Sequence, residues 1–324
     1  MWERRCFQAG FFVLILAVVV RLVSTGVVAT VMKNPMTVSA VVLMETGRWV
    51  GSIPEKSDPA PNVETVSKTP TPQTVAFTAE DGALVEVNNV CGYGVDIEAM
   101  LAEPLSWDLM QETPTVLILH SHGSESYQNT EGYTQSSAYR TLDKNYNVVS
   151  VGKRLKERLE GAGIGVIHDT SLHDYPSYDD AYVAARETIA AYLEAYPSIC
   201  LVIDLHRDAV EDGSGNQLGY TINAEGQKTA QLMMVVGTNA SGRNHPNWER
   251  NMALAVKLHV QLQKQTPGIC RAISFRTQRF NQDLSPGGML IEVGAAGNTR
   301  QEALLAADRL AEGIIALAKG TEVY

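Results

Sequence analysis

Two histidines and a glutamate follow a short apolar run in the middle of the 324-residue chain. The run at 116–119 ends at His120. His122 and Glu125 lie just beyond it in an H-x-x-E spacing, which lets an imidazole nitrogen and a carboxylate oxygen converge on one ion. Zinc accepts such ligands, and in catalytic sites it binds three protein groups and a water. Alone the motif is weak, because a histidine beside a carboxylate also occurs in ordinary loops.

Two further apolar runs end in a polar residue of the same kind. His206 follows the run at 199–205, and Glu292 follows the run at 289–291. Open α/β sheets bind their ligands at the carboxyl ends of the strands, so these residues can meet the H-x-x-E pair there. We therefore predict Zn2+ held by His122, Glu125 and His206. Glu292 would act as the general base that takes a proton from zinc-bound water.

His120 and His122 compete for the role of zinc ligand, because residues two apart on a strand point the same way. The H-x-x-E spacing favours His122, which leaves His120 a supporting or substrate-polarising role. For His206 the structural alternative is a satisfied core histidine. Asp204 and Asp208 flank it, however, and a carboxylate on the non-ligating ring nitrogen would fix the tautomer that a metal ligand needs.

Glu292 also has a structural alternative. An ionised carboxylate in an apolar strand is costly unless it is paired or lies near a metal. An ion pair with an arginine such as Arg207 would satisfy it without any catalytic role.

The elements that must position these residues alternate between strand and helix. The pattern predicts one α/β domain with a mostly parallel sheet flanked by helices on both faces, of the zinc amidase or carboxypeptidase kind. We expect strands at 116–120, 165–169, 199–206, 231–237, 272–280 and 289–292, and helices at about 150–160, 178–196, 245–265 and 299–319.

The first residues form a different kind of segment. Residues 1–33 contain two apolar runs after Arg4 and Arg5, long enough for a helix to cross a bilayer. The basic residues favour a cytoplasmic N-terminus, which places the bulk of the chain outside the cell membrane. A cleaved signal peptide ending near 27–29 is the alternative.

Three further segments follow the predicted anchor. Residues 34–48 show no clear period and 51–74 are rich in Pro, Ser and Thr, so we predict a flexible linker over 34–74. We expect 75–112 to be an N-terminal extension and 113–324 to be the catalytic domain. Cys91 and Cys270 are the plausible disulfide pair, although the sequence does not decide whether they meet.

The charge of the chain excludes one class of partner. With 26 basic and 36 acidic residues, the net charge is −10, and no basic cluster offsets it. Nucleic-acid phosphates demand a basic face, so we expect no nucleic-acid partner.

Four blocks of the sequence resemble, in order, the signature of the stage II sporulation protein P family. They are HSHGSESY at 120–127, DLHRD at 204–208, NQDLS at 281–285 and IEVG at 291–294. The resemblance runs from about residue 113 to the C-terminus and includes the anchored layout of the N-terminus. It implies a membrane-anchored, zinc-dependent peptidoglycan hydrolase of spore-forming bacteria.

The resemblance also implies a substrate and partners. The enzyme would cut the amide between N-acetylmuramic acid and L-alanine, and stem-peptide crosslinks, during engulfment of the forespore. The implied partners are the stage II sporulation proteins D and M. Asn281 and Gln282, which match a family block, and Arg207 are the candidates for substrate binding.

Two other functions stay open at this point. A zinc carboxypeptidase would need a residue for the free carboxylate of its substrate, for which Arg207 and Arg276 are available. A non-catalytic wall-binding module would keep the fold without the chemistry. The presence of all four candidate residues speaks against that last reading.

Overall fold

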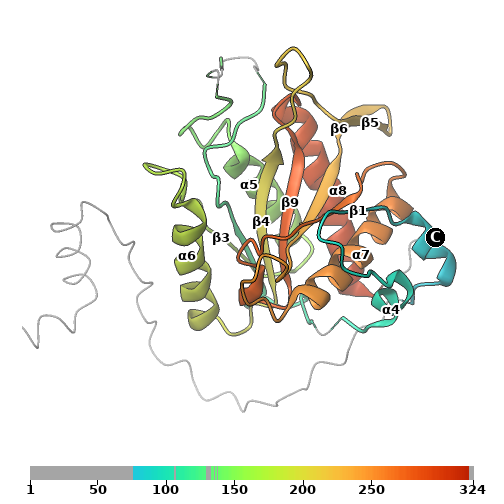
Figure 1. Ribbon diagram of the computed structural model, residues 1–324. Helices are drawn as coiled ribbons and strands as arrows, with labels where there is room; N and C mark the ends of the chain where they lie inside the picture. The colour runs from blue at the N-terminus through green and yellow to red at the C-terminus, as the bar shows by residue number, and fades with distance from the viewer. Residues whose placement is uncertain (1–75, 106, 129–132, 135, 137, 321–324) are drawn as a thin grey trace, which may run out of the picture. The chain divides into compact units, whose positions relative to one another are not determined.

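The computed structural model describes residues 76–105, 107–128, 133, 134, 136 and 138–320 (Figure 1). The predicted anchor at 1–33, its signal-peptide alternative and the linker at 34–74 lie outside these residues. Among the helices of the described part of the chain, none combines the length and apolar character that crossing a bilayer requires.

The domain is built on a seven-stranded sheet with the strand order β1-β8-β7-β9-β4-β2-β3. All neighbouring strands are parallel except β7 and β9, so the prediction of a mostly parallel sheet is confirmed. The strands are β1 (Val87–Asn89), β2 (Val116–Leu119), β3 (Val166–His168), β4 (Leu201–Asp208), β7 (Leu232–Val236), β8 (Ile273–Phe275) and β9 (Gly288–Ala295).

The one antiparallel pair divides the sheet into two groups of opposite direction. Strands β9, β4, β2 and β3 run one way, and β7, β8 and β1 run the other way. The carboxyl ends of β2, β4 and β9 therefore share one edge of the sheet, which we call the site edge. The carboxyl end of β8 lies at the opposite edge.

Helices cover both faces of the sheet, as the alternating pattern predicts. On one face α6 (Ala181–Ala195) packs through Ala185 and Ile189 against side chains of β2 and β4. The other face carries the larger core, to which α5 (Val148–Glu160), α7 (Trp248–Gln265) and α8 (Arg300–Lys319) contribute. Figure 1 shows α6 standing apart from α7 and α8, with β4 and β9 between them.

The alternation of side chains along β4 decides which residues can form a site. Val202 packs on the α6 side, whereas Ile203 and Leu205 belong to the larger core on the other side. Because successive side chains of a strand point to opposite faces, Asp204 and His206 share the α6 face with Val202.

Local sequence signals account for the helix ends. Asn147 caps α5 by accepting a hydrogen bond from the Val149 N–H. Thr299 and Glu302 form a reciprocal capping box at the start of α8. Such caps satisfy backbone N–H groups that have no partner within the helix, so these two helices begin where the sequence marks them.

Residues 76–112 are part of the domain's own fold. They form a short 3-10 helix η1 (Ala79–Leu84), β1 and α4 (Ile97–Ala102). Strand β1 pairs with β8 at one end of the sheet, and both η1 and α4 contact α7. The N-terminal extension expected at 75–112 therefore supplies an edge strand of the sheet.

Other details depart from the sequence-based expectation. A hairpin of β5 (Thr221–Ala224) and β6 (Gln227–Ala230) was not predicted. Strand β8 spans three residues instead of the expected nine, because the chain leaves the sheet after Phe275. Cys91 and Cys270 are both free thiols.

Candidate metal centre

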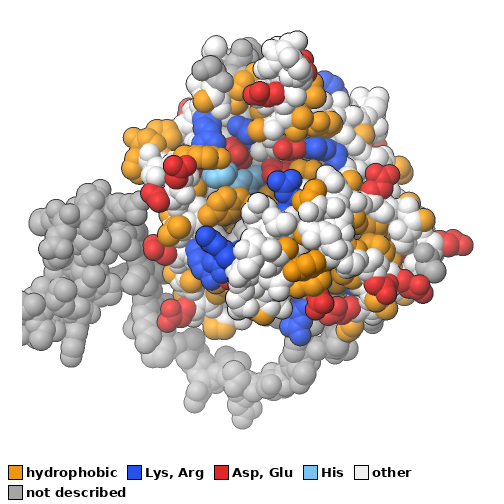
Figure 2. All heavy atoms as spheres, in the orientation of Figure 1, with side chains coloured by type: hydrophobic (Ala, Val, Ile, Leu, Met, Phe, Trp, Pro, Cys, Tyr) orange, Lys and Arg blue, Asp and Glu red, His pale blue; other side chains and the backbone are white. Residues whose placement is uncertain are grey.

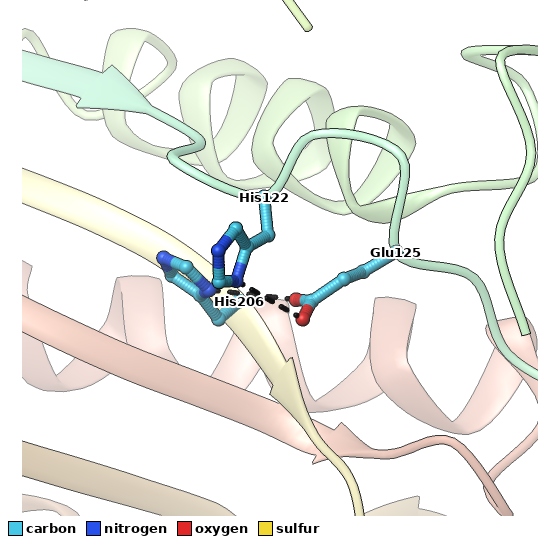
Figure 3. Close-up of side chains that lie close together, drawn as sticks. All are labelled: His122, Glu125 and His206. Carbon is cyan, nitrogen blue, oxygen red and sulfur yellow. Dashed lines mark ion pairs between the residues drawn. The ribbon is translucent and has the colours of Figure 1, made fainter. Parts of the chain in front are cut away.

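Three side chains converge at the site edge, from the turn after β2 and from β4 (Figure 3). The His122 Nδ1 atom lies 3.6 Å from Glu125 Oε1, and the His206 Nδ1 atom lies 3.4 Å from Glu125 Oε2. One ligand atom from each residue lies within 4.8 Å of the others. The structure thus brings together the three residues predicted to hold the metal.

Each histidine lies at a spacing from the Glu125 carboxylate that fits a tetrahedral metal ion. Two ligand atoms about 2.1 Å from a zinc ion, at a tetrahedral angle, lie about 3.4 Å apart. The two measured separations are close to this value. Two imidazoles and one carboxylate are also a donor set that zinc accepts in catalytic sites, where the fourth position is left for water.

Asp204 contacts His206 on the side of the ring that faces away from Glu125. Its Oδ1 atom lies 2.8 Å from the His206 Nε2 atom, so the carboxylate faces the ring nitrogen that points away from Glu125. Burial alone would raise the pKa of the Asp204 carboxyl, but the His206 imidazole and the hydrogen bonds from Ser121 lower it. A carboxylate there favours a proton on Nε2 and leaves Nδ1 free to bind a metal. Asp208, the other flanking carboxylate, pairs with Arg271 at 2.6 Å.

Arg207 holds Glu125 in place. Its backbone N–H donates a 3.2 Å hydrogen bond to Glu125 Oε2, and its Nη1 atom lies 3.7 Å from Glu125 Oε1. Burial by itself would raise the pKa of Glu125, yet the Arg207 charge and the two site histidines hold it well below its usual value. The ionised form that a metal ligand needs is therefore favoured.

The rest of the Arg207 side chain is also occupied by the protein. Nε donates to the Ser126 carbonyl at 2.9 Å and Nη2 to the Tyr139 carbonyl at 2.8 Å. Only 5% of the residue is exposed. The geometry therefore does not favour the substrate-binding role expected for Arg207, which braces the loop that carries Glu125.

Glu292 lies beside His206, because the two residues are paired across β4 and β9. Paired residues of neighbouring strands project to the same face of a sheet, so the Glu292 carboxylate lies on the α6 face with the cluster. Its Oε2 atom is buried without a hydrogen-bond partner among the described residues. Burial raises the pKa of Glu292 to about 8. No cation of the described chain forms an ion pair with it, so the structural alternative involving Arg207 is not observed.

His120 lies on the other face of the sheet. Its ring packs against α5, where a Cβ atom on Gly152 would come within 2.7 Å of it. Nδ1 lies 2.8 Å from the Leu205 carbonyl oxygen and Nε2 lies 2.9 Å from His168 Nε2. Burial and the neighbouring His168 lower the pKa of His120 to about 3. A fully buried ring with both nitrogens engaged does not favour a substrate-polarising role.

The separation of His120 from His122 has a simple cause. The rule that residues two apart point the same way holds only within a strand. Strand β2 ends at Leu119 and a turn follows, so His122 is carried back to the α6 side. The structure therefore places His122 in the candidate metal site and leaves His120 out of it.

Asn281 and Gln282 satisfy backbone groups of the protein. The Asn281 amide donates to the Tyr182 carbonyl at 2.7 Å. The Gln282 amide accepts from the Gly237 N–H at 2.8 Å and donates to the Val235 carbonyl at 2.7 Å. These contacts fasten the loop before β9 to α6 and β7. They do not favour the substrate contacts expected for the two amides.

Three residues at the site were missed in the sequence. Tyr178 stacks on the His122 ring with centroids 4.5 Å apart, and Tyr182 lies 5.2 Å from His122 and 6.4 Å from His206. The Arg140 guanidinium lies 3.8 Å from the centre of the Tyr178 ring. The spacing of the two tyrosines, four apart at the start of a predicted helix, is the signal that could have revealed them.

The cluster of His122, Glu125 and His206 reaches the surface of the molecule. Figure 2 shows histidine side chains at the surface, surrounded by hydrophobic, basic and acidic side chains. His122 is the most exposed of the three predicted ligands, with 12% of its side chain accessible. A ligand can therefore approach the cluster from the side of His122 and Tyr178.

Fold and site together define an α/β protein with a three-ligand candidate metal centre at one edge of its sheet. Residues 52–315 match the family model of stage II sporulation protein P. The chain belongs to the stage II sporulation protein P family, which confirms the resemblance seen in its sequence.

A named relative in this family is stage II sporulation protein P of Bacillus subtilis (strain 168). It is 27% identical to this chain over 209 residues, which are 61% of this chain and 49% of the relative. The chain thus spans about half the length of the curated relative that it matches.

Solved structures of N-acetylmuramoyl-L-alanine amidases show a partial likeness of fold. AmiC2 of Nostoc punctiforme is 13% identical, covers 63% of this chain and 94% of its own, and has a TM-score of 0.37. The enzyme of Clostridium difficile 630 is 15% identical, with coverages of 64% and 96% and a TM-score of 0.35. Ami1 of Mycobacterium abscessus is 14% identical, with coverages of 63% and 99% and a TM-score of 0.38.

Proposed function

We propose that this protein is a zinc-dependent peptidoglycan hydrolase of sporulation that cuts the amide between N-acetylmuramic acid and L-alanine. The observation that carries the proposal is the cluster of His122, Glu125 and His206 at the site edge, with the unpartnered carboxylate of Glu292 beside it. Membership of the stage II sporulation protein P family supports the role in sporulation.

Each residue of the site has a chemical part in this proposal. A zinc ion held by His122, Glu125 and His206 would polarise the scissile carbonyl and lower the pKa of a bound water. The charge of a bound zinc ion would favour the ionised form of Glu292, which would then accept a proton from the attacking water and pass it to the leaving nitrogen. A base needs a free acceptor atom, and its buried Oε2 atom without a hydrogen-bond partner meets that need.

Asp204 and Arg207 keep the ligands oriented. Asp204 fixes the tautomer of His206, and Arg207 keeps Glu125 ionised and in position. Ligands that are already oriented lose little freedom when the metal binds, so these contacts favour one geometry of the site.

Location and partners extend the proposal to parts of the chain outside the described residues. We propose that residues 1–33 anchor the protein in the cell membrane and that 34–74 link this anchor to the hydrolase on the outer side. The sequence resemblance supports engulfment of the forespore as the setting, and stage II sporulation proteins D and M as partners. It also supports a second activity on stem-peptide crosslinks.

Neither Arg207 nor Arg276, the two arginines that suggested a carboxypeptidase, is placed to bind the free carboxylate of a substrate. The guanidinium of Arg207 is held by backbone carbonyls, and Arg276 follows β8, whose carboxyl end lies at the opposite edge of the sheet. The wall-binding alternative gives no reason for a carboxylate at position 292 with a buried oxygen that has no hydrogen-bond partner among the described residues.

The released ends identify the reaction. Purified sacculi are digested with the full-length protein loaded with zinc, and the new chemical ends are determined. Lactyl ends together with free N-terminal alanine are expected from the amidase. Released D-alanine indicates a carboxypeptidase, and binding without new ends indicates a wall-binding module, so either result contradicts the proposal.

A further inference from the structure

Arg140 is tied by the backbone to a predicted metal ligand. It forms an isolated antiparallel bridge with Glu125, and neighbouring hydrogen bonds join Ser126 to Tyr139 and Thr141 to Ser124. The loop that contains Arg140 is therefore fastened to the turn of the metal site.

The side chain of Arg140 reaches the site through an aromatic ring. Its guanidinium carbon lies 3.8 Å from the centre of Tyr178, and that ring lies 4.5 Å from the ring of His122 at an interplanar angle of 25°. A guanidinium that stacks on an aromatic face keeps its N–H groups directed outward in its own plane. Arg140 thus places a positive charge one ring away from a metal ligand.

Within the described part of the chain, the N–H donors of Arg140 have few partners. The one ion pair of its guanidinium in the described structure is a 3.7 Å contact with Asp174, too long for a hydrogen bond. The Asp174 carboxylate already accepts hydrogen bonds from the backbone and side chain of Ser124. About 30% of the Arg140 side chain is exposed.

Several other arginines of the described chain are bound by the protein. Four examples are the short guanidinium contacts of Arg186 with Asp283, Arg207 with two carbonyls, Arg271 with Asp208 and Arg300 with Ser150. Arg140 contrasts with all four, because it lies beside the cluster with donors still available for a ligand.

We propose that Arg140 determines the substrate class by binding a free carboxylate that the substrate carries within two residues of the scissile amide. A guanidinium recognises a carboxylate through two parallel N–H···O bonds, which suits an exposed planar fork held on a tyrosine ring. The substrate class is therefore an acidic peptide amide. This inference rests on the hydrolase function proposed above.

The distance between Arg140 and the metal site sets the limit of two residues. Contacts of 3.8 and 4.5 Å separate the guanidinium carbon from the Tyr178 ring and that ring from His122. A peptide advances about 3.3–3.6 Å per residue when extended. A carboxylate one or two residues from the bond at the metal site therefore reaches Arg140.

Two matched peptides test the assignment. Both are N-acetylmuramoyl-L-alanyl peptides, with a free α-carboxylate on the second residue in one and a carboxamide in the other. The full-length wild type should prefer the carboxylate, and Arg140→Gln should lose about 10- to 100-fold in kcat/KM on it, mainly through KM. The carboxamide should change less than about threefold, since it offers no charge to pair.

Further variants separate recognition from misfolding. Arg140→Lys should be intermediate on the carboxylate, because an ammonium keeps the charge without the planar fork. Arg276→Gln removes an exposed arginine at the opposite edge and should change neither substrate. An equal loss on both peptides in Arg140→Gln, or no preference in the wild type, overturns the assignment.

Measurements of peptide binding test the specificity of Arg140 independently of the proposed hydrolysis. The affinities of both peptides are measured by calorimetry for Glu292→Gln with and without Arg140→Gln. A preference for the carboxylate that disappears with Arg140 supports the specificity even where no cleavage occurs. Tight binding of both peptides without discrimination overturns it, whereas an inactive wild type with the preference intact contradicts only the proposed hydrolase function.

Discussion

Two regions that both match blocks of the family signature use their polar side chains in opposite ways. In the block at 281–285, the amides of Asn281 and Gln282 form hydrogen bonds with backbone groups. At the site edge, Glu292 has a buried oxygen without a partner, and the atoms of His122 and His206 that face Glu125 lie at metal-ligand spacing. The first region therefore uses its amides to hold the fold together, whereas the second places its polar side chains for a ligand.

His120 and His122, the two histidines of the block at 120–127, differ in the same way. His120 has both ring nitrogens engaged on the α5 face, while His122 lies in the open cluster on the α6 face. Only one residue lies between the supporting His120 and the predicted ligand His122, and the turn that begins there directs their side chains to opposite faces of the sheet.

Removal of a predicted ligand should have the largest effect. His206→Ala is expected to lose bound zinc and all measurable hydrolysis, because two remaining ligands do not hold the ion in a catalytic geometry. Metal content by plasma emission and sacculus digestion check both losses. His259→Gln, a buried histidine on α7, is the control and should keep zinc. Full zinc occupancy in His206→Ala would remove His206 from the ligand set.

Loss of the predicted base should affect turnover without affecting the metal. Glu292→Gln keeps the size of the side chain but cannot accept the proton, so kcat should fall by about 10²- to 10⁴-fold while zinc stays bound. Exposed Glu249→Gln is the matched control and should be fully active. Activity near that of the wild type would refute the role of Glu292 as base.

Loss of the carboxylate behind His206 should have a smaller effect. Asp204→Asn removes the group that fixes the His206 tautomer, and zinc affinity should fall by about 10- to 100-fold. Competition with a chromophoric chelator measures it. An unchanged zinc affinity in Asp204→Asn would contradict the role of Asp204 in orienting His206 at the site edge.

Substitution in the block at 281–285 should reduce stability and leave the chemistry intact. Gln282→Met leaves the Gly237 N–H and the Val235 carbonyl without partners, so the free energy of unfolding should fall by about 1–3 kcal/mol. Zinc content and kcat per folded molecule should match the wild type. A specific loss of kcat, with stability unchanged, would return Gln282 to the substrate site.

The smallest effect concerns the stability of the metal-free protein. Glu292 has a pKa of about 8 when folded, above its usual 4.5, so the folded state holds this proton more tightly than the unfolded state. The stabilisation that this proton gives to the folded state is complete below pH 4.5 and is lost as the pH rises through 8. Glu292→Gln should therefore match the wild type in melting temperature at pH 4 and exceed it by a few degrees at pH 8. A difference independent of pH would contradict the raised pKa.

Much of the fold follows from periodicity in the sequence. The long helices α5, α6, α7 and α8 were predicted because their apolar faces repeat over many turns, and the buried strands β2 and β4 because they are continuous apolar runs. The short strands β5 and β6 carry too few residues for such a signal, and only Ile273–Phe275 of the strand expected at 272–280 lies in the sheet. The reversed direction of β7 was also not predictable, since it is set by pairing with β9.

The candidate site was predicted in part. Strand ends revealed His122, Glu125, His206 and Glu292, because apolar runs that stop at a polar residue are visible in a sequence. The roles of Arg207 and Gln282 were not, since a sequence does not show which polar atoms the backbone satisfies. Tyr178 and Arg140 were missed because their contacts with the site depend on loop geometry.

Zinc-edge X-ray absorption of the zinc-loaded full-length protein tests the central claim most directly. The account predicts one zinc per chain, with two imidazole nitrogens and carboxylate and water oxygens at about 2.0–2.2 Å. His122→Ala should lose the bound zinc, as His206→Ala should, whereas the spectrum should not change in His120→Ala. A sulfur ligand at about 2.3 Å, or an imidazole count that depends on His120 instead of His122, would contradict it.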